Sequence, residues 1–93
     1  MKLNKKMEKE FFFYLDREVK KLKVVFKNVK IKRGGEKVFK LASSYFEDLK
    51  YFLDKKEFVK AFELENYIWG ILDTLANLNL LEIPKRIRKW FKV

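Results

Sequence analysis

The spacing of the apolar residues constrains this chain most, because they recur at steps of three and four almost throughout. That spacing gathers them on one side of an α-helix, whereas no long stretch alternates at period two, as a half-buried strand would. Two breaks interrupt the pattern, at Gly34-Gly35 and at Pro84. We therefore expect an all-α fold: a small three-helix bundle with a central antiparallel helical hairpin and a short C-terminal fourth helix.

The expected helices cover about residues 4–29, 36–53, 55–79 and 84–92, in a single helical domain of residues 1–93. The first has an apolar stripe with lysines almost opposite it. The third is apolar over a wider arc, which is typical of a central helix with several neighbours. Gly70 lies inside this third helix, where we expect a close approach of another backbone to explain it.

The ends of the helices are predicted from capping residues. Asp54 and Glu57 have the spacing of a capping box, and Leu53 with Phe58 would form its hydrophobic staple. The second and third helices should then form a tight antiparallel hairpin. The third helix should end at a left-handed residue, and the candidates are Asn77 and Asn79. Pro84 suits the first position of the fourth helix.

Composition excludes many kinds of chemistry. The chain has no cysteine and no histidine, so it lacks thiols, the commonest general base and the commonest zinc ligand. We expect no catalytic residues, no cofactor and no metal. The sequence contains no stretch of 18 apolar residues that would predict a membrane span. No secretory signal is recognisable either, so we expect a cytoplasmic protein. Abundant lysine and glutamate without glutamine fit a heat-adapted organism.

The charge is concentrated at the two ends of the chain. The net charge is +10. Residues 1–33 contribute +8 and residues 84–93 contribute +5, whereas residues 34–83 contribute −3. A basic surface of this kind attracts nucleic acid or another anionic partner, or it serves only solubility. The candidate patch for an anionic partner consists of Lys20, Lys23, Lys27, Lys30, Lys32, Arg33, Lys85, Arg86, Arg88, Lys89 and Lys92.

Three spaced motifs lie between residues 38 and 81. An Ala-x-x-Tyr-x-x-Asp element lies in the second expected helix, and an aromatic-x-x-Ala-Phe element precedes Tyr-x-x-Gly-x-x-Asp in the third. This combination resembles the archaeal domain-of-unknown-function family numbered 357. The matching positions are Ala42, Tyr45, Asp48, Phe58, Ala61, Phe62, Tyr67, Gly70 and Asp73.

The resemblance implies a small helical bundle in an intracellular archaeal protein, and it implies no established activity. The family usually has Gly-Asp at the hairpin turn, where this chain has Lys56-Glu57. It also has a glycine after the third helix, where this chain has Asn77 or Asn79.

The spacing of the polar motif residues does not favour a catalytic site. In the expected hairpin Asp73 lies level with Val38, about 15 Å along the helix from Asp48, too far for an acid–base pair. We expect Asp73 to pair with a lysine of the second helix, Lys37 or Lys40, or to cap a neighbouring helix end. Tyr45 should face Tyr67, with both rings at the edge of the core, or else lining a small polar pocket.

We favour a non-catalytic protein-interaction or assembly module, dimeric or bound to a protein partner. One three-helix core does not bury all the apolar residues, and those off its seams are Val25, Tyr51, Val59 and Trp69. Exposed apolar area of this kind usually marks association. Trp90 and Phe91 should dock on the bundle rather than lie on a membrane surface.

The alternative is an RNA- or DNA-binding module that uses the basic N- and C-terminal helices. Phe12 and Phe13 lie on the basic side of the first helix and would stack on bases, unless the fourth helix or a second subunit covers them. A third hypothesis is a carrier of a small ligand, with Tyr45 and Tyr67 in its pocket.

Overall fold

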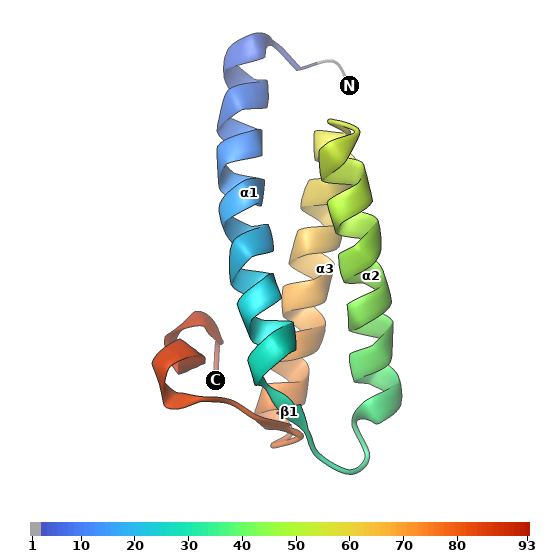
Figure 1. The fold of residues 1–93 in the computed structure, drawn as a ribbon, viewed down its shortest axis with the longest axis vertical. Helices are drawn as coiled ribbons and strands as arrows, with labels where there is room; N and C mark the ends of the chain where they lie inside the picture. The colour runs from blue at the N-terminus through green and yellow to red at the C-terminus, as the bar shows by residue number, and fades with distance from the viewer. Residues whose placement is uncertain (1–2) are drawn as a thin grey trace.

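The computed structural model describes residues 3–93, and it confirms the all-α fold with three long helices (Figure 1). The helices are α1 (Lys5–Asn28), α2 (Glu36–Asp54) and α3 (Phe58–Asn77). Two short strands, β1 (Lys30–Ile31) and β2 (Leu81–Glu82), pair near one end of the bundle, and the 3₁₀ helix η1 (Lys85–Trp90) follows. The helices α2 and α3 form the antiparallel hairpin, and α1 packs against both.

One hydrophobic core joins all three helices and the C-terminal segment. Most of its buried helical side chains come from the stripes that the sequence predicts, but Val25 and Phe46 lie outside those stripes. The C-terminal segment adds Leu81, Ile87 and Phe91. The fully buried large apolar residues are Leu15, Leu22, Val25, Leu49, Ile68 and Leu72. Because the C-terminal segment contributes to this core, it lies beside the C-terminal half of α1 (Figure 1).

The strand pair was not expected, because we predicted a plain loop between the first two helices. Lys30 lies opposite Glu82 and Ile31 opposite Leu81, in antiparallel register. The paired segments are two residues each, too short to leave any periodic signal in the sequence. The pairing joins segments some fifty residues apart and directs the C-terminal segment towards α1.

The predicted capping box at Asp54 and Glu57 is wrong. Asp54 is the last residue of α2, and Glu57 precedes α3 without a side-chain capping hydrogen bond among the described residues. The turn is instead a Schellman motif: Lys56 N–H donates to Leu53 O at 3.0 Å, and Glu57 N–H donates to Phe52 O at 2.9 Å. Lys56 takes the left-handed position of this motif, with φ 60°.

A second Schellman motif ends α3. Asn79 is left-handed with φ 61°, as one of our two candidates predicted, whereas Asn77 is the last helical residue. Asn79 N–H donates to Ala76 O at 3.0 Å and Leu80 N–H donates to Leu75 O at 2.8 Å. After this stop Pro84 precedes a short 3₁₀ helix, not the α-helix expected over 84–92.

Of the four apolar residues that the sequence placed off the main seams, one is fully buried and another is partly buried against the core. Val25 is fully buried, and Trp69 packs edge-to-face on Phe91 with ring centroids 5.6 Å apart. The C-terminal segment supplies the cover that a core of three helices alone would lack. Tyr51 and Val59 do stay exposed.

Phe12 and Phe13 are not covered by the fourth helix. Their side chains are 48% and 74% exposed, and they lie in the N-terminal half of α1. η1 lies beside the other half of that helix (Figure 1). The rings border a groove with Lys56 and Phe58 of the hairpin turn.

Candidate functional site

The basic residues predicted to bind an anionic partner are all exposed. They come from two segments of the chain, residues 20–33 and 85–92, which the fold brings together. We call this set the basic surface: Lys20, Lys23, Lys27, Lys30, Lys32, Arg33, Lys85, Arg86, Arg88, Lys89 and Lys92. The first six belong to α1, β1 and the loop after it, and the other five belong to η1 and the residue pair after it. The two groups are about fifty residues apart in the sequence.

Three side-chain contacts hold the two groups side by side, in addition to the β1–β2 pairing. Arg86 Nη2 donates to Asn28 Oδ1 at 3.0 Å. Lys32 Nζ donates to Asn79 Oδ1 at 3.0 Å. The Lys21 ammonium lies 5.7 Å from the centroid of the Trp90 ring. The C-terminal cations are therefore fixed beside the end of α1 and do not extend away from the bundle.

Asp73 and Asn77 of α3 hold the far end of this segment. Asp73 Oδ1 accepts from Lys92 N–H at 3.0 Å, and Asn77 Nδ2 donates to Lys92 O at 2.9 Å. This contact gives Asp73 a structural role, as expected, but its partner is the backbone after η1 and neither of the predicted lysines.

The two segments that contain the basic surface carry the whole net charge of the protein, +10. Residues 20–36 and 79–93 contain twelve basic and two acidic side chains, whereas the rest of the chain contains eleven of each. Within residues 3–93, Lys20 is the only member of the basic surface in an ion pair, with Asp16 at 2.9 Å. The field at this end is consequently strongly positive and little compensated.

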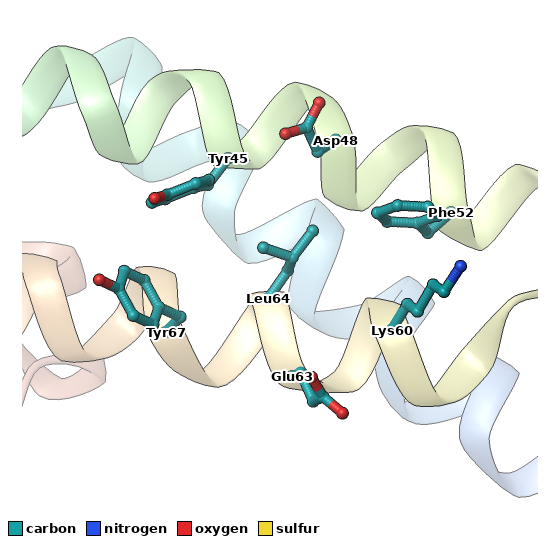
Figure 2. Close-up of a pocket in the computed structure, with 7 residues that line it drawn as sticks. All are labelled: Tyr45, Asp48, Phe52, Lys60, Glu63, Leu64 and Tyr67. Atoms are coloured by element: carbon teal, nitrogen blue, oxygen red, sulfur yellow. The ribbon is translucent and has the colours of Figure 1, made fainter.

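Three of the four polar residues of the family motifs, all except Asp73, lie in a shallow groove between α2 and α3 (Figure 2). The groove has a volume of about 370 Å³ and includes Tyr45, Asp48, Phe52 and Tyr67. The two tyrosine rings meet edge-to-face with centroids 5.2 Å apart, as predicted. Asp48 and Glu63 lie at opposite margins of the groove and point away from each other (Figure 2). The structure thus brings no two carboxylates together here.

The apolar motif residues belong to the core or its edge. Ala42, Ala61 and Phe58 are buried. Phe62 is 38% exposed and packs edge-to-face on Phe11 of α1. These positions therefore hold α1 against the hairpin.

Gly70 contradicts our expectation of a close backbone approach. A Cβ built on Gly70 would meet no atom within 4 Å among the described residues. A glycine inside a helix is about 1 kcal/mol less favourable than alanine, and the packing within this chain offers no reason for it. Gly70 lies in a second, apolar groove of about 590 Å³ that continues the first along the α2–α3 hairpin and shares Tyr67 with it.

A buried polar network between α1 and α3 was missed by the sequence reasoning. Glu18 and Glu65 are 6% and 2% exposed. Tyr14 Oη donates to Glu65 Oε1 at 2.8 Å, and Trp69 Nε1 donates to Glu18 Oε1 at 3.0 Å. Arg17 and Lys21 pair with Glu18 at 3.2 and 3.5 Å. The available signal was a glutamate at an apolar-stripe position of each helix.

Burial alters the acid–base properties of this network. Desolvation, reinforced by repulsion from Glu18, raises the pKa of the Glu65 carboxyl above its usual value, while the hydrogen bond from Tyr14 opposes the change. Burial and the hydrogen bond to Glu65 also raise the pKa of the Tyr14 hydroxyl. Every buried polar side-chain atom in the described part of the chain has a hydrogen-bond partner, so the network is closed and structural.

Two further observations concern metals and membranes. Among residues 3–93, no group of three or more acidic side chains is placed to hold a metal ion. None of the helices in this part of the chain is both long and apolar enough to cross a bilayer.

Comparison with known proteins gives one match. No curated protein and no solved structure matches this chain. A family model described as "Protein of unknown function (DUF357)" matches residues 10–81. The match includes α1 from residue 10 onwards, the buried network and the α2–α3 grooves, and it ends before η1. The chain therefore belongs to this family, in agreement with the resemblance of its motifs.

Proposed function

We propose that this protein is a non-catalytic module that binds the phosphate backbone of a nucleic-acid duplex through its basic surface. The observation that carries the proposal is the convergence of α1, β1 and η1, which gathers the whole net charge of +10 at one end of the molecule. Lysine and arginine that neutralise phosphates release counterions, and this release drives sequence-independent binding.

The kind of nucleic acid follows from the aromatic residues. Single strands bind by stacking bases on exposed rings. The most exposed aromatic side chains of the described chain are Phe12, Phe13, Tyr51 and Tyr67, and all four lie outside residues 20–36 and 79–93. Trp90 is half-buried beneath Lys21. A surface with cations and few available rings suits the regular phosphates of a duplex.

Salt dependence tests this proposal. If about five phosphates are neutralised, the logarithm of the association constant should fall with a slope of about −4.5 against the logarithm of salt concentration. The measurement is fluorescence anisotropy with labelled DNA and RNA duplexes of equal length. A slope near zero, or tighter binding to anionic lipid vesicles than to either duplex, would overturn the proposal.

Two matched triple variants locate the interface. Lys23, Lys27 and Lys30, each changed to Gln, should weaken binding and reduce the salt slope by about three. The second triple changes Lys5, Lys6 and Lys9 to Gln. It removes the same charge from the N-terminal end of α1 and should leave the slope nearly unchanged. Equal effects of the two triples would mean that only the net charge matters, and the proposed surface would be wrong.

A second function, protein assembly, is favoured by a different surface. We define the outer face as the side of α2 and α3 away from α1, formed by Val38, Leu41, Tyr45, Tyr67, Gly70, Ile71 and Leu78. Val38 and Leu41 are each 44% exposed, and Tyr67 and Leu78 are 55% and 63% exposed. Adjoining exposed apolar side chains commonly mark an association site.

Light scattering over a concentration series tests assembly. We expect a mass of twice 11.4 kDa at high protein concentration. Leu41→Glu should give the monomer, whereas Phe12→Glu, at an apolar site of α1 with similar exposure (48% against 44%), should not. A monomer at every concentration would exclude self-assembly.

We further propose a cytoplasmic protein of a heat-adapted archaeon. Abundant lysine and glutamate without glutamine support the heat adaptation, and the archaeal, intracellular origin is what the family resemblance implies.

A further inference from the structure

We infer that the outer face binds a second copy of this chain in antiparallel orientation, with the two α3 helices crossing at Gly70. The inference rests on the assembly proposal and adds the partner, the orientation and the contact point. It is independent of nucleic-acid binding, since the basic surface takes no part in it.

The position of Gly70 is the first argument. The residue lies in the middle of α3, in the apolar groove beside Tyr67, Ile71 and Leu78, and the space above it is open within the described chain. Helices approach more closely where the side chains at their contact are small. A helix of another molecule that crosses α3 here would account for a glycine that the packing of one chain leaves unexplained.

Charge complementarity identifies that helix as part of a second copy. On α2 the outer face has Lys37 beside one end and Asp48 at the margin near the other. Consider a two-fold axis that lies in the interface, perpendicular to the helices. It reverses the direction of the second copy and places the α2 helices of the two copies opposite each other. Lys37 of each copy then lies near Asp48 of the other, and two ion pairs form symmetrically.

This register also brings Gly70 to the crossing point. If Lys37 of one copy pairs with Asp48 of the other, the two-fold axis passes midway between these two positions of α2, level with Ala42 and Ser43. The contact of Tyr45 with Tyr67 shows which residues of α2 and α3 lie level, and by that alignment the axis passes level with Gly70 on α3. The proposed ion pairs and the position of Gly70 are therefore satisfied by one and the same axis.

The net charge also favours the antiparallel arrangement. A parallel dimer would place two basic surfaces side by side. The antiparallel dimer places them at opposite ends of a molecule whose long dimension is 44 Å. That separation greatly exceeds the screening length of about 8 Å at physiological salt. The dimer would consequently present two separate basic surfaces.

Cross-linking tests the orientation, because the chain has no cysteine of its own. A mixture of Lys37→Cys and Asp48→Cys proteins should give the mixed disulfide dimer on mild oxidation, since a disulfide needs Cα atoms within about 7 Å. Each variant alone should give much less dimer. Preferential self-linking of Lys37→Cys would indicate the parallel arrangement and overturn the inference.

Gly70→Ala tests the crossing point through two effects of opposite sign. Alanine improves the helix, so the melting temperature of dilute, monomeric protein should rise by about 4 °C. The added methyl group should weaken the dimer at least tenfold. Ser43→Ala is the control and should leave the dimer unchanged, because Ser43 lies on the opposite side of α2 from Leu41 and outside both grooves.

The results separate the possible failures. A dimer that shows neither the mixed disulfide nor a response to Gly70→Ala keeps assembly and overturns this inference. A monomer at all concentrations overturns both. Loss of duplex binding with an intact mixed disulfide would reject only the nucleic-acid proposal.

Discussion

Glu65 is the most deeply buried charged side chain in the described protein, at 2% exposure. It lies in the apolar stripe of α3, between Ala61 and Ile68, and accepts hydrogen bonds from Tyr14 and Asn66 at 2.8 and 3.3 Å. Burying a carboxylate is unfavourable unless it is paired, and its nearest charged neighbours are another carboxylate, Glu18, and the cations that pair with Glu18. This position should therefore make stability depend on pH.

Glu65→Gln should change that dependence in a defined direction. The pKa of Glu65 is raised in the folded state, so the folded protein binds this proton more tightly than the unfolded chain. The free energy of unfolding then falls as pH rises from about 4.3, the unfolded value, through the folded-state pKa. Glutamine removes the titration and still accepts from Tyr14, so the variant should be more stable than the natural chain at pH 7, by a margin that shrinks towards pH 4.

Urea unfolding at several pH values measures this margin. Glu63→Gln, at an exposed position of the same helix, should follow the natural chain at every pH. A margin that grows as the pH is lowered would contradict the role assigned to Glu65.

Lys56 is strained by its left-handed backbone, φ 60°, which a non-glycine residue adopts at a cost of about 1–2 kcal/mol. Glycine stands at this position in the family pattern and adopts this conformation freely. Lys56→Gly should raise the free energy of unfolding by about 1 kcal/mol, as measured by chemical denaturation. Lys55→Gly, at the adjacent residue with φ −82°, should lower it. A loss of stability in both variants would argue against the Schellman turn.

At the scale of the elements, apolar periodicity was enough to locate α1, α2 and α3, because each helix keeps one stripe over four turns or more. It could not predict the β1–β2 pair, which depends on a contact between Ile31 and Leu81 fifty residues apart. The predicted capping box misplaced the start of α3, because Lys56 could be identified as left-handed only from the backbone.

The candidate site was predictable as a set of residues but not as a surface. Composition identified every cation of the basic surface, yet nothing in the sequence places Arg86 beside Asn28. Glu18 and Glu65 occupy apolar-stripe positions, but the sequence does not show which partners would satisfy them, because Tyr14 and Trp69 each come from the other helix.

The docking of η1 should depend on Asp73. Its carboxylate accepts the Lys92 N–H, and a hydrogen bond to a charged group contributes about 1.5–3 kcal/mol. Asp73→Ala should therefore speed amide hydrogen exchange in residues 85–92 by about tenfold or more, while exchange in the middle of α3 stays slow. Asp48→Ala, at an exposed position of α2, is the matched control. Uniform acceleration along the chain would show that Asp73 supports the whole fold and not one segment.

For the whole molecule, the shared core predicts cooperative unfolding. Ile68 is fully buried in the core cluster, which combines side chains from all three helices and the C-terminal segment. Ile68→Ala should lower the free energy of unfolding by about 2–5 kcal/mol, with circular dichroism and tryptophan fluorescence reporting one coincident transition. Two separate transitions would mean that α1 or the C-terminal segment folds apart from the hairpin.

The charge distribution also belongs to the whole molecule. Eleven exposed cations from both ends of the sequence share one end of the bundle, and the chain outside residues 20–36 and 79–93 has equal numbers of basic and acidic side chains. A protein of this kind should meet a polyanion in one orientation, since the field guides the basic end towards it.

The most direct test of this account is a proton–nitrogen correlation spectrum of labelled protein titrated with a DNA duplex at low salt. We predict that the amide signals that shift or broaden belong to the C-terminal half of α1, to residues 29–35 and to η1, in one continuous surface. Changes centred on Phe12 and Phe13, changes on the outer face, or an unchanged spectrum would contradict the claim that the two basic ends of the chain form one binding surface.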